Sequence, residues 1–238
     1  QKEAIEKLAT HNKYILADDM GLGKTTSAVI AALESGIERV LIVCPASLKI
    51  NWKREIQNYT DKSISIVEGK KWESADFVIM NYDILKNFHD IKNKEDSIIL
   101  QEGFDLVIVD EAHYIQNVQA KRTKLINDII NSIGKVWLLT GTPMTSRPIN
   151  YYNLLNLVES PVAYNWMAYA IRYCEGYQFN VGNRRIWNVT GSSNLTELRD
   201  RTKTHVLRRL KQDILDLPDK IITPVYLNLK SKEYMALM

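Results

Sequence analysis

Cysteine is scarce in this sequence, and the two that occur, Cys44 and Cys174, stand far apart in unrelated contexts. Neither belongs to a CxxC pair or has histidines at ligand spacing, so the pattern indicates neither a disulfide framework nor a zinc site. Also missing are a run of about 18 apolar residues, which would cross a bilayer, and the basic-then-apolar start of a secretory signal. These absences predict a protein of a reducing compartment, cytoplasmic or nuclear, that is not secreted and has no membrane partner.

The composition is that of a globular protein. Apolar residues make up 45% of the chain and charged residues 25%, which is enough apolar material to bury a full core. The net charge is only +3, but the basic surplus lies after residue 160, where 12 Lys and Arg stand against 7 Asp and Glu. Such a surplus fits a polyanionic partner and a solvated surface equally well, so charge alone does not decide between them.

Short apolar runs alternate with amphipathic stretches before Pro148. The runs are rich in Val and Ile and predict buried parallel strands: YILA from Tyr14, VLIVCP from Val40, FVIMN from Phe77, FDLVIVD from Phe104 and KVWLLTG from Lys135. Helical composition or spacing occurs at 24–35, 48–59 and 121–132, which predicts crossover helices. The alternation predicts the α/β class, with a mostly parallel sheet as the middle of three layers.

The pattern changes after Pro148. Tyrosine and tryptophan become frequent, a polar GSSN begins at Gly191, and 194–205 has the composition of a charged helix. We therefore predict a mostly helical insertion over 149–205. Beyond it, LPDK and the alternating ITPVYLNL indicate a linker over 222–238 that enters a strand of another unit.

A glycine-rich loop, DDMGLGKTT, begins at Asp18 between a predicted strand and a predicted helix. Gly21 and Gly23 allow the backbone to approach phosphate oxygens. Lys24 brings a cation to the β- and γ-phosphates, and Thr25 offers a hydroxyl to Mg²⁺. A lone GKT also fits an ordinary turn, but the whole order predicts a site for ATP and Mg²⁺. Asp18 replaces the usual first glycine, which argues against a nucleotide kinase or a small GTPase.

Two carboxylates follow another predicted strand. FDLVIVDEAH places Asp110 and Glu111 at the carboxyl edge of the sheet, where ligands bind in open α/β folds. Asp110 is suited to hold Mg²⁺, and Glu111 to polarise the attacking water. His113 is predicted to link the ATP site to another motif. Taken alone, this segment also fits a strand that enters a polar turn.

The predicted strand that ends in LLTGTP carries hydroxyls to the same edge. Thr140 and Thr142 follow its apolar residues, and Gly141 between them allows a sharp turn. We expect this segment and His113 to couple the ATP site to bound nucleic acid, although an ordinary strand-exit turn remains an alternative.

The motifs DDMGLGKT, CPASL, DEAH and TGTP, in this order, resemble those of the superfamily-2 helicases and translocases. With Trp52, NYDIL, DEAHYIQN and RRLKQDILDLPDK the set is similar to the Swi/Snf ATPase family, and SRPINYYNLLNLV and GSSNLTEL are most similar to its HARP-like branch of annealing helicases. The resemblance implies a RecA-like P-loop NTPase lobe over 1–148 and 206–221, with 149–205 as a protrusion. It implies a DNA-dependent ATPase or translocase that moves on or remodels DNA.

The resemblance also assigns contacts. Lys24, Asp110 and Glu111 would be catalytic, and Thr25 with Asp110 would hold the metal. The residues that would bind ATP are Gln1, as part of an adenine-reading motif, and Met20, Gly21, Leu22, Gly23, Lys24, Thr25 and Thr26. Those that would lie along the phosphates of one DNA strand, independently of base sequence, are Pro45, Ala46, Ser47, Asn81 and Tyr82. Arg208, Arg209 and Lys211 would brace the lobe or face DNA, and we expect bracing.

The family places its arginine fingers on a second RecA-like lobe, of which 222–238 would supply at most the first strand and turn. We therefore expect that lobe in the same parent chain, and expect this chain alone to bind ATP weakly and hydrolyse it poorly. Two alternatives stay open: the motor lobe of a restriction, nuclease or defence assembly, and a nucleic-acid-binding module with a vestigial ATP site. Only the resemblance favours DNA, duplex or branched, over RNA, because phosphate contacts do not separate them.

Overall fold

The computed structural model describes residues 1–182 and 184–214 of the chain. Its strands are β1 (Lys13–Leu16), β2 (Val40–Cys44), β3 (Ile64–Ile66), β4 (Phe77–Asn81), β5 (Leu106–Asp110), β6 (Val136–Leu139), β7 (Tyr177–Val181), β8 (Arg184–Asn188) and β9 (Val206–Leu207). The five strands predicted from apolar runs are confirmed as β1, β2, β4, β5 and β6. The linker predicted over 222–238 lies outside the described residues.

Most of these strands form a single parallel sheet, in the order β3-β4-β2-β5-β6-β1-β9. Strands β2, β4, β5 and β6 are buried at every position, which is why they appear in the sequence as continuous apolar runs. The loops that follow β1, β2, β4, β5 and β6 all leave from one edge. Every predicted site motif therefore lies at that edge, and the predicted α/β class with a mostly parallel sheet is confirmed.

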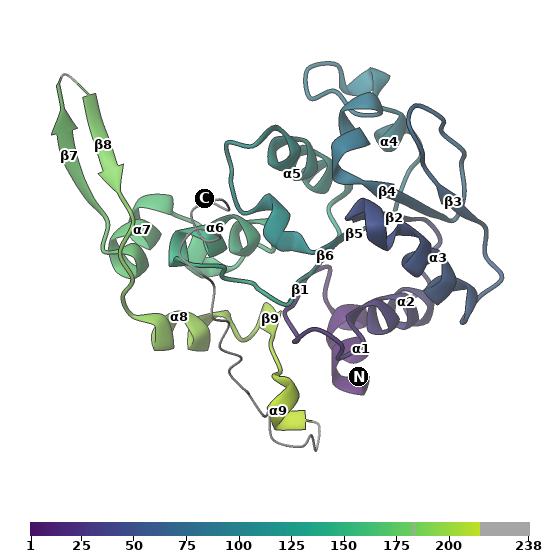
Figure 1. Ribbon diagram of the computed structural model, residues 1–238, viewed down its shortest axis with the longest axis horizontal. Helices are drawn as coiled ribbons and strands as arrows, with labels where there is room; N and C mark the ends of the chain where they lie inside the picture. Colours follow the sequence, from purple (N-terminus) through teal and green to yellow (C-terminus); the bar gives the residue numbers. More distant parts are fainter. Residues whose placement is uncertain (183, 215–238) are drawn as a thin grey trace, which may run out of the picture.

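Helices cover both faces of the sheet. They are α1 (Lys2–Thr10), α2 (Lys24–Glu34), α3 (Lys49–Gln57), α4 (Ile98–Gln101), α5 (Lys121–Ile133), α6 (Pro148–Leu157), α7 (Trp166–Cys174), α8 (Leu195–Thr202) and α9 (Lys211–Ile214), with 3-10 helices η1 (Ala46–Leu48), η2 (Tyr82–Asn87), η3 (Lys94–Asp96), η4 (Ala112–Ile115) and η5 (Pro161–Ala163). Figure 1 shows α1, α2 and α3 on one side of the sheet and α5 on the other, and each side has its own apolar core. Among the described helices, none has the length and apolarity to cross a membrane.

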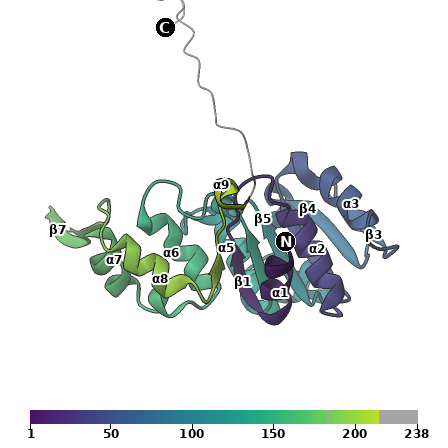
Figure 2. The ribbon, with the colours of Figure 1, turned by 90° about the horizontal axis from the view of Figure 1, so that it is seen from below.

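The insertion predicted over 149–205 contains α6, α7 and α8, but it is not only helical. An antiparallel hairpin of β7 and β8 lies between α7 and α8. Apolar periodicity fails to mark it because nearly all of its side chains are exposed. Leu154 and Leu155 of α6 belong to the same core as β5 and β6, so the insertion is joined to the lobe by packing. Figure 2 shows it extending from one end of the molecule.

The chain returns from the insertion at β9, which pairs in parallel with β1. Immediately afterwards the guanidinium of Arg209 binds both oxygens of the Asp18 carboxylate, with 3.1 Å between Nε and Oδ1. The Arg209 backbone N–H donates to Oδ1 at 3.1 Å, and that of Lys211 donates to Oδ2 of Asp19 at the same distance. Asp18 is only 1% exposed. Arg209 thus braces the lobe, as expected, through the residue that replaces the usual first glycine.

We predict that Arg209→Ala lowers the free energy of unfolding by about 3 kcal/mol, because it leaves the buried Asp18 carboxylate without its counter-charge. Arg208 is exposed and makes no ion pair within residues 1–182 and 184–214, so Arg208→Ala should change stability by less than about 0.5 kcal/mol. Denaturant unfolding of the two variants measures the difference. Equal stabilities would show that the ion pair does not hold the returning segment.

Candidate nucleotide site and nucleic-acid pocket

The loop between β1 and α2 contains the predicted phosphate-binding residues. Gly21 and Gly23 have φ angles of 81° and 77°, in the left-handed region that glycine adopts without strain. Helix α2 begins directly afterwards at Lys24. A glycine loop that opens a helix of 11 residues provides backbone N–H groups and a positive helix end, the arrangement that binds phosphate in proteins.

Lys24 places its ammonium inside this loop. Its Nζ donates to the carbonyl oxygens of Asp18 at 2.7 Å and Asp19 at 3.2 Å. Burial lowers the pKa of Lys24, and the nearby carboxylates of Glu111 and Asp110 act in the opposite direction. The structure therefore brings the lysine of the first motif into the electrostatic field of the carboxylates at the end of β5.

Asp110 ends β5 as a buried carboxylate, 6% exposed. Its Oδ2 accepts a hydrogen bond from Nε1 of Trp52 at 2.8 Å, and its Oδ1 accepts one from the backbone N–H of Glu111 at 2.9 Å. Burial raises the pKa of Asp110, and the Trp52 hydrogen bond opposes that shift. Trp52, which the sequence marks only as part of the family resemblance, is thus a direct partner of the predicted metal-binding carboxylate.

Glu111 adopts a left-handed backbone conformation, with φ of 51°. This conformation is strained for a residue with a side chain, and such strain concentrates at functional sites. Its Oε2 lies 3.1 Å from Nδ1 of His113, without the alignment of a hydrogen bond. His113 also packs on Tyr114, with ring centroids 4.7 Å apart. The observed contacts of His113 therefore lie within its own segment.

The remaining predicted ATP contacts fall on different sides of the loop. Gln1 lies against it, since a Cβ at Gly23 would stand 2.2 Å from the Gln1 Nε2 atom. Leu22 is nearly buried, at 9% exposure. Thr25 is half-buried in the first turn of α2. The hydroxyl of Thr26 donates to a carboxylate oxygen of Glu55 on α3, so this side chain is directed at the neighbouring helix.

The loop after β6 packs against the phosphate loop. Thr140 is fully buried, and its Oγ1 accepts a hydrogen bond from the backbone N–H of Thr142 at 3.1 Å. A Cβ at Gly141 would stand 3.2 Å from Cγ of Met20 and 3.8 Å from Nζ of Lys24. Glycine at this position therefore permits close contact between the two motifs, and the predicted coupling residues do lie beside the predicted ATP site.

Gln116 joins the DEAH and TGTP segments, although it is not among the predicted site residues. Its Nε2 donates to the carbonyl of Pro143 at 3.0 Å, and its Oε1 accepts from the hydroxyl of Thr145 at 2.8 Å. The polar side chain within DEAHYIQN is the only signal in the sequence that could have identified it. The side-chain link between these two motifs thus runs through Gln116, while His113 contacts Glu111.

A pocket of about 120 Å³ collects most of the predicted nucleic-acid residues. Its lining consists of Pro45, Ala46, Asn81, Tyr82, Asp83, Tyr114 and Arg122. Ser47 is exposed but does not line it. The loops after β2 and β4 meet here because those strands are neighbours in the sheet. Tyr114 and Arg122 are additional members that the sequence motifs did not select.

Tyr82 connects this pocket to the carboxylate site. Its hydroxyl donates to the backbone carbonyl of Asp110, and burial holds its pKa well above the ordinary value, so the donor stays protonated. Its ring stacks on Tyr114, with centroids 5.5 Å apart, and Tyr114 in turn lies 5.7 Å from the guanidinium of Arg122. One aromatic side chain therefore lines the pocket and holds the residue that ends β5.

The fold and the converging motifs define a RecA-like P-loop NTPase lobe. A family model described as SNF2-related domain matches residues 1–236, so the chain belongs to that family of ATPases. The Xenopus laevis protein "SWI/SNF-related matrix-associated actin-dependent regulator of chromatin subfamily A-like protein 1" is 32% identical over 96% of this chain and 24% of its own length. The Bos taurus protein "DNA annealing helicase and endonuclease ZRANB3" is 32% identical over 93% of this chain and 21% of its own length. The predicted resemblance to the Swi/Snf family and its annealing helicases is confirmed.

Solved structures agree on the fold. The Sulfolobus solfataricus SWI2/SNF2 ATPase core in complex with double-stranded DNA superposes with a TM-score of 0.68 at 24% identity, over 98% of this chain and 49% of that one. A hypothetical ATP-dependent RNA helicase from Sulfolobus tokodaii gives a TM-score of 0.51 over 67% of this chain. The chain spans about a quarter of the Xenopus relative and about half of the Sulfolobus core.

We predict that Trp52→Phe destabilises the protein more at neutral pH than at acidic pH. The variant removes the donor that opposes the raised pKa of Asp110, so that pKa rises further. The Asp110 carboxyl then binds its proton more tightly in the folded state than in the unfolded state. The free energy of unfolding of the variant therefore falls as pH rises from the ordinary aspartate pKa through the raised pKa of Asp110.

Trp137→Phe is the matched control for this substitution. Trp137 is equally buried, but its Nε1 donates to a backbone carbonyl, that of His11. A backbone carbonyl carries no titratable proton. Both variants lose the same volume, so urea unfolding at pH 4.5 and 7.5 isolates the carboxylate effect. A destabilisation by Trp52→Phe that is the same at both pH values would contradict the role assigned to this hydrogen bond.

Proposed function

We propose that this chain is the ATP-binding lobe of a DNA-dependent ATPase that couples ATP hydrolysis to movement on DNA or to its remodelling. The observation that supports the proposal most directly is the convergence of Lys24 with Asp110 and Glu111 beside a glycine loop that opens a helix. Lys24 begins α2 and Asp110 ends β5, so these residues are far apart in the sequence and only the folded sheet brings them together.

Each residue then has a chemical role. Lys24 would exchange the carbonyls of Asp18 and Asp19 for the β- and γ-phosphates of ATP. Thr25 and Asp110 would hold Mg²⁺, because their oxygens are the hard donors that this ion takes, together with phosphates and waters. Bound Mg²⁺ neutralises charge that develops on the phosphates.

Glu111 would orient and deprotonate the attacking water. Its Oε2 is buried and has no aligned hydrogen-bond partner among the residues that the structure describes, so this acceptor is available to a ligand. The left-handed backbone at Glu111 lies where β5 ends and η4 begins. A buried acceptor without an aligned donor supports a catalytic glutamate more than a structural one.

DNA is the polymer that the comparisons favour. One relative is named as a DNA annealing helicase, and the Sulfolobus core is described in complex with double-stranded DNA. In this chain the pocket beside Asp110 would contact a strand through Pro45, Ala46, Asn81 and Tyr82, without reading base sequence. A protein that acts on DNA works in the nucleoid or the nucleus.

We further infer a second RecA-like lobe in the same protein. The Sulfolobus core is about twice the length that this chain matches. Closure of that lobe over the edge that carries Lys24 and Asp110 would exclude water and supply the arginine fingers that the family resemblance implies. Nucleotide binding by the first lobe alone would then be weak.

We predict that Lys24→Ala, in the intact protein, abolishes DNA-stimulated ATP turnover, with a loss of at least about 10²–10³-fold. Glu111→Gln should lower turnover by about 10²–10⁴-fold while nucleotide affinity is retained, because it removes only the base. Steady-state hydrolysis with duplex, forked and single-stranded DNA and with RNA measures both effects and identifies the polymer.

The exposed Lys70, which lies outside every motif, provides the control, and Lys70→Ala should behave as the unmodified protein. Undiminished turnover by Lys24→Ala would refute the proposal. Firm DNA binding with no detectable ATP binding in the unmodified protein would instead identify a vestigial nucleotide site.

We predict a separate effect for Tyr82→Phe. This change keeps the ring in the pocket but removes the donor to the Asp110 carbonyl, so maximal DNA-stimulated turnover should fall about 10-fold, the equivalent of one buried hydrogen bond. The affinity for DNA should stay within about 2-fold. Titration of ATPase rate against DNA concentration separates the two quantities.

Tyr114→Phe is the matched control, because the Tyr114 hydroxyl makes no hydrogen bond within the described residues while its ring stacks on Tyr82. It should leave maximal turnover unchanged. An equal loss in both variants would show that the effect does not come from the Tyr82 hydrogen bond to the Asp110 carbonyl.

A further inference from the structure

The hairpin of β7 and β8 extends away from the body of the protein. Figure 1 shows it beyond α7, far from the large sheet, and among the described strands it pairs only within itself. Every side chain of β7 is exposed, as are the first three of β8. The cores of the lobe therefore do not depend on this segment, and its side chains are available to a partner.

The two faces of the hairpin differ in chemistry. Paired residues share a face, and alternate residues along a strand share one too. Phe179 pairs with Ile186, and Tyr177 and Val181 flank Phe179 on the same face. These four side chains are 41%, 43%, 56% and 52% exposed, respectively. Such a contiguous apolar stripe on a projecting element marks an interaction surface.

The opposite face has a different environment. It carries Gln178, Asn180 and Arg185. Its aromatic residue, Trp187, is half-buried and packs edge-on against Trp166 of α7, with ring centroids 5.3 Å apart. This face is therefore mostly polar and is partly packed against α7. The stripe that contains Tyr177 and Phe179 is the accessible face.

The charge of the hairpin is entirely positive. Arg184 and Arg185 begin β8 and are exposed, and the segment 177–190 contains no Asp or Glu. Neither arginine forms an ion pair with any carboxylate in the described part of the chain. Arg184 pairs with Val181 and so shares the face of the stripe. An apolar and aromatic stripe beside an arginine without an ion pair in the described residues complements a polyanion that also exposes aromatic surface.

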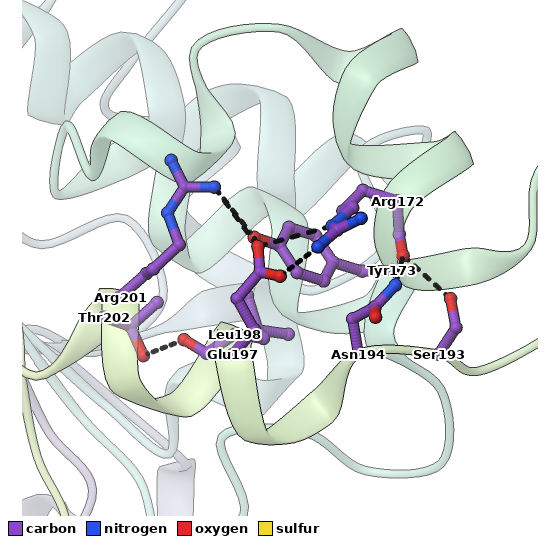
Figure 3. A network of polar contacts seen from close by, with 8 residues as sticks. All are labelled: Arg172, Tyr173, Ser193, Asn194, Glu197, Leu198, Arg201 and Thr202. Carbon is purple, nitrogen blue, oxygen red and sulfur yellow. Dashed lines mark hydrogen bonds and ion pairs between the residues drawn. The ribbon is translucent and has the colours of Figure 1, made fainter.

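The base of the hairpin is held rigidly. Figure 3 shows Ser193 and Asn194, which follow it, bound to the main chain of Arg172 at the end of α7: Ser193 Oγ and Asn194 Nδ2 each donate to the Arg172 carbonyl at 2.7 Å. The guanidinium of Arg172 binds Glu197 of α8 and holds the pKa of that carboxyl at about 2. A Cβ at Gly191 would stand 2.9 Å from the Cys174 carbonyl, so the two ends of the hairpin are in close contact.

We propose that this hairpin is a second nucleic-acid site, which engages unpaired bases where a DNA duplex opens or branches. Tyr177 and Phe179 would stack on exposed bases, since stacking on aromatic side chains accepts every base. Arg184, on the same face, would bind an adjoining phosphate. Intact duplex offers no free base faces, so the stripe selects junctions over blunt duplex. The assignment rests on the proposed function, because it takes DNA as the polymer of the motor.

The test uses the intact protein with the double variant Tyr177→Ala/Phe179→Ala and the single variant Arg184→Ala. The first should weaken binding to a fork with single-stranded arms about 10-fold and leave blunt duplex binding unchanged, because stacking requires unpaired bases. The second should lower the slope of log affinity against log salt by about 0.7 for the fork, the contribution of one phosphate contact on a single strand.

The control is Gln178→Ala/Asn180→Ala on the opposite face, which should bind the fork as the unmodified protein does. Blunt-duplex-stimulated ATPase should survive in all three variants, whereas absence of that activity from the unmodified protein would count against the motor assignment. Equal melting temperatures exclude misfolding, since the mutated side chains are exposed. Unchanged affinity of both hairpin variants for the fork would overturn the proposal and leave the stripe to a protein partner.

Discussion

The parallel arrangement of the sheet is the constraint on which the site depends. Parallel strands all end at the same edge, and burial on both faces confines polar chemistry to the loops that leave that edge. Helices α1 to α3 and α5 cover the two faces, so the loops after β1, β5 and β6 converge there. Lys24, Asp110 and Gly141 therefore approach one another although long segments of chain separate them.

The interaction between Asp18 and Arg209 gives a physical reason for the unusual first position of the phosphate loop. A glycine there could not accept the two guanidinium hydrogen bonds that hold the returning chain beside β1. The side chain of Lys211, next to this brace, comes within reach of Gly21, as a Cβ there would stand 3.2 Å from its Nζ. The segment that returns from the insertion is thus attached directly to the loop that would bind phosphate. Movement of one would therefore displace the other.

Much of this arrangement can be predicted from the sequence. The strands and partners that could not be predicted have in common that they leave no local pattern in it. Strands buried on both faces appear as unbroken Val and Ile runs, so β2, β4, β5 and β6 are predicted correctly. Strands β3 and β9 have three and two residues, too few to show a pattern, and the hairpin is exposed and lacks one. The partners of Asp110 and of Asp18 lie 58 and 191 positions away, and no local pattern can identify such pairs.

Asp110 is held from three directions, and this gives events in the pocket a route to the carboxylates that we propose are catalytic. Trp52 and the Glu111 backbone N–H bind its side chain, while Tyr82 binds its carbonyl from the pocket side. The peptide that begins at this carbonyl leads directly into the strained backbone of Glu111. A strand of DNA that displaced the Tyr82 ring would alter that hydrogen bond and, with it, the orientation of Glu111. Coupling then requires only a local two-state rearrangement of one loop, and no change in the sheet.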